Sequence, residues 1–455
     1  MVFNFKHINR FLLIFYITFI SCDVDMSDEA QLATYPTTAE VFDDSFSSGL
    51  DYFPFENSVF EAFRVDSEVK FSGTSSMRFN IPNVNNPNGG YAGAIFRTTS
   101  GRDLSNYNAL TFWAKASYPG TVDNFGFGQD FAENRYLVTM QNVKLSTDWE
   151  KYIIPLPDPS KLTNERGLFW YSEGPENGNG YSIWVDEVKY EKLGNIGQYR
   201  PVIFNSESKS ITGFVNSNIK VEGLTQTVNL GNGIDQKIQI APSYFDFISS
   251  NPSIASVNSN GFIEIKQVGN TVITAKFNGI DVEGSLNIEA IPFDNAPTPT
   301  HLATDVISIF SNAYSNVNID YYNGYWQPYQ TTESSIIEIS NNAIINYNNL
   351  NFVGIQFRNP TINASTKKYL HLDVYTTDPI VAESVLYVDL LDFNPPNSRG
   401  GAVFNSTVLK SKQWMSLEID ITTLGLSRRD EIGQIILNSA ATLKNIYVDN
   451  IYFHN

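Results

Sequence analysis

The chain has 455 residues, of which 42% are hydrophobic and 14% aromatic, and at about 150 residues per domain this length predicts three domains with packed cores. The formal net charge of −18 argues against nucleic acid and anionic membrane as ligands, and makes an acidic polysaccharide a poorer ligand than a neutral one, because the average field repels all three. The single cysteine excludes an internal disulfide and a Cys-based metal site.

The first 21 residues have the pattern of an export signal. Lys6 and Arg10 precede a short apolar run that is too short to span a bilayer comfortably, and the small residue Ser21 and then Cys22 follow that run. This arrangement resembles a bacterial lipoprotein processing site, which implies cleavage before Cys22 and lipidation of its thiol. The alternative is an ordinary secretory signal with a chance cysteine. Residues 22–38 are predicted to be a flexible tether, and their acidic start resembles the signal that sends Bacteroidetes lipoproteins to the cell surface.

Residues 39–195 are predicted to form a jelly-roll β-sandwich. Short runs of β-branched and aromatic residues, such as 77–81 and 109–113, alternate with turn clusters such as 88–90. No long window has the periodicity of a helix. A sandwich of about 150 residues fits this pattern.

Residues 200–291 have a different sequence pattern. A Ser-Asn-Pro-Ser-Ile-Ala stretch at 250–255 is followed by the turn residue Gly261 and by a Gly-Asn-Thr-Val-Ile-Thr-Ala run that starts at Gly269. This combination resembles the bacterial immunoglobulin-like domain of the Big_2 type, which implies a small antiparallel sandwich of the kind used as a spacer. The proline-rich stretch at 292–300 predicts a short, stiff linker.

Residues 297–455 repeat the pattern of the first module. The run Tyr91–Arg97 reappears as Phe352–Arg358 with Gly and Arg at the same spacing, and Tyr181–Tyr190 reappears as Ile446–Phe453. The predicted fold class is therefore all-β, with two jelly-roll sandwiches flanking an immunoglobulin-like sandwich in an extended chain. Two copies of one unit indicate a protein that touches an extended partner more than once.

Two aromatic clusters predict sugar binding, because pyranose C–H faces stack on exposed rings and sugar hydroxyls need planar hydrogen-bonding groups. The stretch 321–329 contains four tyrosines and one tryptophan, too many for all to be core, and 168–173 ends at a Gly-rich loop. In the second cluster, alternation puts Trp170 on one face and Tyr171 and Glu173 on the other. The predicted ligand-binding residues are Trp326, Tyr325, Tyr329, Arg358, Trp170, Tyr171, Glu173, Arg97 and Gln129. The alternative is that the rings fill the sandwich and the arginines pair with carboxylates.

The pattern also resembles jelly-roll sugar binders that hold a structural calcium ion. The resemblance implies that Asp44 and Asp186 are the ligands in the first module, and oxygen ligands suit this ion. In the second copy Asp449 matches Asp186, but Ser308 stands where Asp44 would be, which makes a second calcium site doubtful. The alternative is a pair of solvated acids.

Catalytic motifs are sparse. The three histidines beyond residue 22 are far apart in the sequence, and neither a Gly-x-Ser-x-Gly elbow nor a His-Glu-x-x-His pattern is present. The stretch Glu418–Leu424 resembles the Glu-x-Asp motif of laminarinase-type hydrolases but lacks the final Glu that would be the general acid. The sequence therefore favours a non-enzymatic binder. A divergent hydrolase or lyase that uses Glu418 or Glu173 is the alternative, and a structural adhesin is a third.

The layout as a whole resembles the Bacteroidetes surface glycan-binding proteins of polysaccharide-utilisation systems. The segments that carry this resemblance, besides the lipoprotein start and the domain order, are Asp305–Ser311, Trp326–Gln327 and Leu370–Val374. The resemblance implies a cell-surface protein, held in the outer membrane by its lipid, that captures a polysaccharide such as laminarin, a β-1,3-glucan, beside an outer-membrane importer. This substrate assignment rests on association alone.

Overall fold

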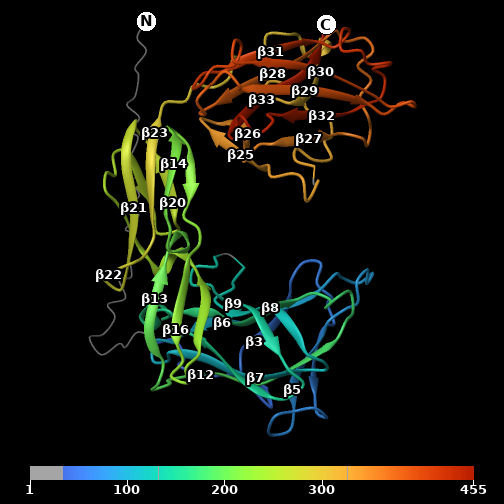
Figure 1. Ribbon diagram of the computed structural model, residues 1–455. Coiled ribbons are helices and arrows are strands. Elements are labelled where there is room, and N and C mark those ends of the chain that lie inside the picture. The colour runs from blue at the N-terminus through green and yellow to red at the C-terminus, as the bar shows by residue number, and fades with distance from the viewer. Residues whose placement is uncertain (1–33, 132, 325) are drawn as a thin grey trace, which may run out of the picture.

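The computed structural model of the protein describes residues 34–131, 133–324 and 326–455. In these residues regular structure consists of β-strands and four single-turn 3-10 helices, η1 (Pro159–Lys161), η2 (Phe204–Ser206), η3 (Pro242–Tyr244) and η4 (Ala303–Asp305). The predicted all-β fold class is confirmed, and Figure 1 shows three regions that follow one another along the chain. A membrane-crossing helix is not found in the described part. The predicted signal and Cys22 lie outside it.

The first module is a sandwich of two sheets. Its back sheet contains β1 (Glu40–Asp43), β2 (Ser45–Phe46), β4 (Phe63–Asp66), β5 (Ser76–Asn80), β7 (Ala109–Ala116), β10 (Glu150–Pro155) and β12 (Ser182–Glu191). Its front sheet contains β3 (Leu50–Pro54), β6 (Ala92–Arg102), β8 (Gly120–Phe127), β9 (Val138–Leu145) and β11 (Glu165–Glu173). The sheets meet through large buried rings. Phe112 of the back sheet lies 5.1 Å from Phe125 and 5.6 Å from Phe169 of the front sheet, centroid to centroid.

The middle region has two small sheets of its own. The larger contains β14 (Ser208–Phe214), β18 (Asp246–Ser249), β21 (Gly269–Phe277), β22 (Ile280–Asp281) and β23 (Ser285–Ile291). The smaller contains β15 (Asn218–Lys220), β19 (Ala255–Val257) and β20 (Phe262–Ile265).

Three strands in or just before the predicted middle domain do not join these small sheets. They extend the front sheet of the first module instead. They are β13 (Gly197–Val202), β16 (Thr225–Asn229) and β17 (Asp235–Ile240). β17 pairs antiparallel with β9, with Gln239 opposite Thr139. The predicted boundary at 195–200 therefore does not separate two independent sheets, and one hydrophobic core runs through both regions.

The second module repeats the two-sheet plan. Its back sheet contains β24 (Ile307–Phe310), β25 (Glu333–Ile339), β26 (Asn342–Asn348), β28 (Tyr369–Thr376), β31 (Met415–Asp420) and β33 (Ile446–His454). Its front sheet has the order β27-β32-β29-β30, with β27 (Phe352–Gln356), β29 (Val385–Asp392), β30 (Ser398–Asn405) and β32 (Ile432–Asn438). This order matches β6-β11-β8-β9 of the first module, so the repeat seen in the sequence is a repeat of topology.

The molecule is C-shaped, and the middle region connects the two modules (Figure 1). At its far end an aromatic cluster joins it to the second module, where Phe214 packs against Tyr447 at 4.9 Å between ring centroids. Trp414 donates its indole N–H to the backbone oxygen of Asp294 at 2.6 Å. The front-sheet strands β3, β6, β8 and β9 lie on the side of the first module that is nearer the second module.

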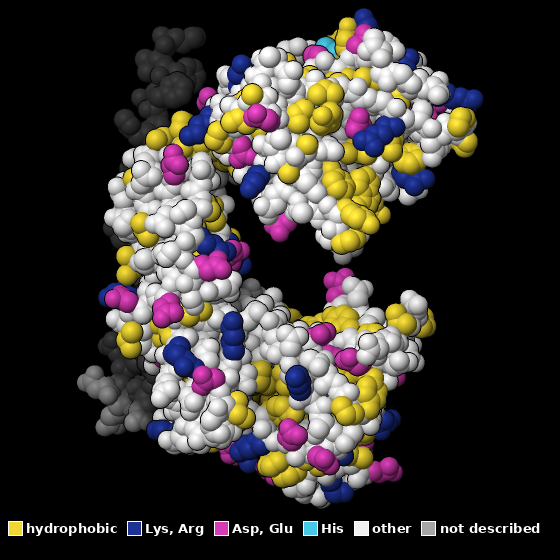
Figure 2. Space-filling view, in the orientation of Figure 1, with side chains coloured by type: hydrophobic (Ala, Val, Ile, Leu, Met, Phe, Trp, Pro, Cys, Tyr) yellow, Lys and Arg dark blue, Asp and Glu magenta, His cyan; other side chains and the backbone are white. Residues whose placement is uncertain are grey.

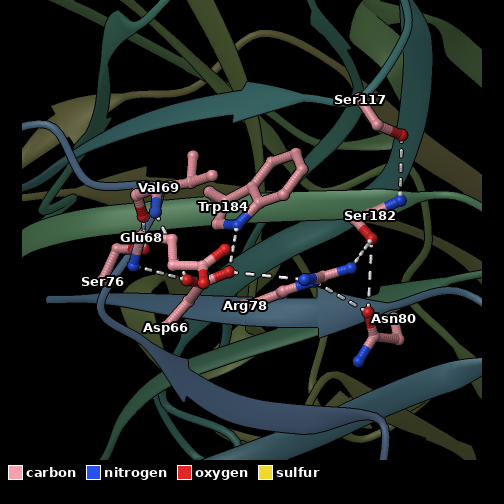
Figure 3. A network of polar contacts seen from close by, with 9 residues as sticks. All are labelled: Asp66, Glu68, Val69, Ser76, Arg78, Asn80, Ser117, Ser182 and Trp184. Atoms are coloured by element: carbon pink, nitrogen blue, oxygen red, sulfur yellow. Dashed lines mark hydrogen bonds and ion pairs between the residues drawn. The ribbon is translucent and has the colours of Figure 1, made fainter.

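A polar network stabilises the outer face of the first back sheet (Figure 3). Asp66 Oδ2 accepts the indole N–H of Trp184 at 2.9 Å and pairs with Arg78 at 3.4 Å, while its Oδ1 accepts two backbone N–H groups. The Arg78 guanidinium lies 5.2 Å from the centroid of the Trp184 ring. Burial alone would raise the pKa of Asp66, but these donors outweigh it and lower the pKa to about 2 from its ordinary 3.8.

Asp66→Asn is expected to lower the free energy of unfolding at pH 7 by about 1–2 kcal/mol, because an amide nitrogen would then face an N–H donor. The pKa of Asp66 is depressed in the folded state, so its contribution is complete above about pH 4 and is lost as the pH falls toward 2. Urea unfolding at pH 7 and at pH 2.5 measures both effects. A difference between variant and wild type that is the same at both pH values would contradict the ionised role of Asp66.

Candidate functional site

The outer face of the first front sheet, called here the first front face, presents a strip of aromatic rings. On β6, Ala94 and Phe96 point into the core, so Gly93, Ile95 and Arg97 point outward. Ile95 is nonetheless only 1% exposed. Its partners in register are Phe53 on β3 and Trp170 on β11, and their rings flank it on the outer surface.

Phe131 is the most exposed ring of this strip, with 65% of its surface accessible. Its ring edge meets Phe53 at a centroid distance of 4.9 Å, and the Arg97 guanidinium lies 5.2 Å from its centroid. Arg97 is held by an ion pair with Asp130 at 2.6 Å. The arrangement leaves a ring surface free while its arginine neighbour is fixed.

Trp170 lies on the same face, on β11 between β6 and β8. It is 8% exposed, it contacts Phe55 at 6.3 Å, and its indole nitrogen lies 2.4 Å from the position that a Cβ atom at Gly126 would take. That indole N–H has no hydrogen-bond partner among the described residues. A Cβ atom at Gly93 would likewise lie 2.8 Å from the Tyr91 ring. Glycines therefore form the floor beneath the rings.

Beyond Gly126 the first front face becomes polar. The side-chain amides of Asn124 on β8, Gln141 on β9 and Gln239 on β17 form a hydrogen-bonded row, with 3.2 Å between Gln141 Nε2 and Asn124 Oδ1. The row crosses from the first module onto the added hairpin. Beside it is a hollow of about 290 Å³, lined in part by Thr139 and Lys237.

The second module has a related arrangement on the outer face of its front sheet, the second front face. Gly354 stands at the repeat position of Gly93, and a Cβ atom there would lie 2.9 Å from the Trp326 ring. Trp326 is half-buried and packs on Phe352 at 5.6 Å between centroids. Tyr329, in the turn that follows, is 77% exposed. Figure 2 shows hydrophobic side chains gathered on the sides of the two modules that face each other.

The two repeat arginines differ in their surroundings. Arg97 is part of the ion pair with Asp130, whereas Arg358 is exposed and its guanidinium lies 4.2 Å from the centroid of Phe393. Gln129 is half-buried next to Asp130 at the edge of the first front face. Both arginines thus lie against an aromatic ring.

Two predicted ligand-binding residues are placed in the interior, which corrects the expectation that they face a sugar. Tyr171 is fully buried and stacks on Phe79 at 3.8 Å, and Glu173 is 2% exposed. Glu173 accepts the backbone N–H of Asp123 at 2.6 Å and the hydroxyl of Tyr181 at 2.8 Å. Burial raises the pKa of Glu173 to about 7, although these two donors act in the opposite direction. Tyr325 lies outside the described residues.

Sequence reasoning missed Phe131, the most exposed ring of the aromatic strip on the first front face, and the strand β17, which carries Gln239. Phe131 stands two residues after Gln129, in a stretch without strand periodicity, so only its neighbours in space mark it. Phe53 and Phe55 have the alternation of an edge strand, and this signal was available.

The predicted calcium ligands hold a loop instead of facing each other freely. Asp186 Oδ2 accepts the backbone N–H groups of Phe71 and Ser72 at 2.8 and 3.2 Å, and Asp44 Oδ1 accepts those of Thr74 and Ser75. A calcium ion needs oxygen ligands at these positions. These contacts engage Oδ2 of Asp186 and Oδ1 of Asp44, and the calcium assignment stays a prediction from the resemblance.

In the second module the matching residues are also engaged. Asp449 Oδ2 accepts the side-chain amide of Asn342 at 2.8 Å, and Ser308 donates to Asn316 Oδ1 at 2.7 Å. These contacts therefore do not support a calcium site in the second module, which the sequence had already made doubtful.

The Glu418 motif lies on the back sheet of the second module, away from the second front face. Glu418 is bonded to two imidazoles, and Asp420 accepts the backbone N–H and hydroxyl of Thr422 in a turn. The strand does not hold two free carboxylates over a groove, as retaining hydrolysis requires.

A family model described as "Carbohydrate binding domain 30" matches residues 38–192, which is the first module alone. No curated protein matches the chain.

Several solved structures are similar to parts of the chain. A family 30 carbohydrate-binding module is 20% identical, covers 34% of this chain and 98% of its own, and has a TM-score of 0.26. The family 30 module of the cellulosomal cellulase Cel9D-Cel44B of Clostridium thermocellum is 20% identical over 36% of this chain and 97% of its own, with a TM-score of 0.24. The tandem CBM22-1–CBM22-2 domain of Paenibacillus barcinonensis Xyn10C is 10% identical over 93% of this chain and 99% of its own, with a TM-score of 0.23.

Proposed function

We propose that the protein is a non-catalytic polysaccharide-binding protein that holds one neutral glycan on both of its front faces. The observation that carries this proposal is the exposed ring beside a glycine floor, present once in each module. The glycines let aromatic side chains lie close against the sheet, and an exposed aromatic plane stacks on the C–H face of a sugar ring. The match of residues 38–192 to a carbohydrate-binding family supports the same function for the first module.

The glycan is proposed to be a β-glucan, with laminarin as the first candidate. A net charge of −18 disfavours acidic polymers, and Arg97 and Arg399, two of the cations on the front faces, are each paired with an aspartate. The choice of laminarin rests on the family resemblance of the sequence alone.

Affinity electrophoresis of the mature chain against laminarin, other neutral glucans and alginate tests this function. Slower migration in at least one neutral glucan, with unchanged migration in alginate, is the expected result. Unchanged migration in every glycan would overturn the proposal, and release of reducing ends or unsaturated products would establish the enzyme alternative.

The binding surface is proposed to continue from the first module onto the hairpin β16–β17. Adjacent strands are about 4.8 Å apart, so β11 to β17 spans roughly 14 Å, enough for two or three sugar rings. The rings lie at the β11 end, while the amide row and Lys237 lie at the β17 end. Amides hydrogen-bond sugar hydroxyls in the plane of the ring.

Gln239→Ala is expected to weaken binding of a long β-glucan oligosaccharide about five- to tenfold, since it removes one or two net hydrogen bonds. A disaccharide that occupies only the aromatic end should bind unchanged. The matched control is Gln236→Ala, which removes the same side chain from the same strand but from three positions away. Calorimetry with both ligands measures the effect, and an equal loss for the disaccharide would contradict the extended surface.

The protein is further proposed to be anchored at the cell surface of an outer membrane through Cys22, next to a glycan importer. Support comes from the export-signal pattern and the family resemblance of the sequence. Cys22→Ser should release the protein from the membrane fraction while its affinity for glycan stays the same. Retention of the serine variant in membranes would contradict lipid anchoring.

A further inference from the structure

All three histidines of the described residues gather at one place, although they are far apart in the sequence. His371 lies on β28 and His454 on β33, and His301 lies between the linker and η4. Glu418, on β31, stands among them on the outer face of the second back sheet, because Leu417 and Ile419 on either side of it point into the core. The chain has only four histidines in 455 residues, so the meeting of three of them at one place indicates a site that the fold assembles.

The contacts within the cluster are short. Glu418 Oε1 lies 2.6 Å from His371 Nδ1, and Glu418 Oε2 lies 2.9 Å from His454 Nε2. The His301 ring stacks on the His454 ring at 3.9 Å between centroids. One donor atom each from His301, Glu418 and His454 lie within 4.8 Å of one another.

The hydrogen-bond pattern leaves a position between Glu418 and His454 that needs positive charge. His454 Nδ1 lies 3.0 Å from the backbone oxygen of Asn455, which can only accept, so Nδ1 carries a proton. If Nε2 has none, its lone pair faces a carboxylate oxygen at 2.9 Å, and the two repel. The two atoms are therefore placed to share a cation.

We propose that His301, Glu418 and His454 bind a transition-metal dication, with zinc the best match. Two imidazoles and one carboxylate are a common three-ligand set for zinc, with water in the fourth position, and Glu418 is 45% exposed toward solvent. A tetrahedral site at zinc–ligand distances of about 2.0–2.1 Å requires ligand separations of roughly 3.3 Å, so the His301 side chain must close in slightly.

The surroundings supply the supporting contacts that metal ligands usually have. The other ring nitrogen of His454 is bonded to a backbone oxygen, and the other carboxylate oxygen of Glu418 is bonded to His371. His371 in turn lies 3.4 Å from Asp373. Because His301 directly follows the linker, a bound ion would fasten the end of that linker to the back sheet of the second module, separately from glycan binding on the opposite sheet.

The test is calorimetric titration of the metal-free mature chain with zinc chloride, together with thermal unfolding with and without zinc. We expect one site per chain with a micromolar or tighter dissociation constant, a higher unfolding temperature, and no response to magnesium. His301→Ala should weaken zinc binding at least tenfold without disturbing the sheet, since this residue lies outside the strands. Asp389→Asn, a carboxylate change on the front sheet, is the control and should bind zinc like the wild type.

Failure to bind zinc would overturn the proposal, and the cluster would then be a pair of imidazoles hydrogen-bonded to Glu418. Equal zinc affinity in wild type and His301→Ala would also overturn it, because the ion would be held elsewhere. Glycan binding is measured in the same samples, so the two proposals stand or fall separately.

Discussion

Phe131→Ala should weaken the binding of a β-glucan oligosaccharide to the first front face about tenfold, while the unfolding temperature stays within about 1 °C of the wild type. Stacking on an aromatic ring contributes about 0.5–1.5 kcal/mol beyond area burial, and 1.4 kcal/mol is tenfold in affinity. The ring is 65% exposed and contacts little besides Phe53 and Arg97, so its removal leaves the core intact.

The matched control for this variant is Phe262→Ala in the middle region. Phe262 is 47% exposed, and its ring centroid lies 5.5 Å from the Lys220 ammonium. Like Phe131, it is an exposed phenylalanine next to a cationic side chain. Calorimetry should find the control equal to the wild type. Equal weakening in both variants would show that the loss does not come from the first front face.

The double variant Phe131→Ala/Trp326→Ala should lose far more affinity for the polymer than for short oligosaccharides. Two faces on one chain hold a repeating polymer together, and this linkage can raise the apparent affinity by ~10²-fold or more. The middle region, joined to both modules through β17 and the Phe214 cluster, keeps the two faces on one scaffold. Each single variant should retain part of the polymer affinity.

Retention on the polymer and calorimetry with a short oligosaccharide, measured on the wild type, both single variants and the double variant, separate linkage from local contacts. Trp326 is half-buried against Phe352, so thermal unfolding of each variant accompanies the binding data. If the polymer affinity of the double variant equals that of the weaker single variant, only one face binds.

The sequence was a good guide where a local pattern decides the structure. The Gly-and-Arg repeat located the equivalent strands β6 and β27, since a strand pattern with a fixed glycine reads the same in both copies. Alternation on β11 correctly separated Trp170 from Tyr171, but it could not say which side is core, because both faces of that strand carry aromatic residues. Tyr171 therefore entered the predicted site although it lies in the core.

Features that depend on the pairing of segments distant in the chain could not be predicted from the sequence. β17 has the alternation of any edge strand, and nothing in it indicates that its partner is β9 of the preceding module. The same holds for the histidines, which meet only because β28, β31 and β33 are neighbours in one sheet. Phe131 needed the fold as well, since its neighbours Phe53 and Arg97 come from two other strands.

The most direct measurement of the central claim is the number of short β-glucan oligosaccharides that one mature chain binds in calorimetry. Two sugar-binding faces predict two bound ligands per chain, falling to one in Phe131→Ala and in Trp326→Ala at concentrations that saturate only the intact site. Heat of binding that is absent with every neutral oligosaccharide, or that is unchanged in both variants, would contradict it.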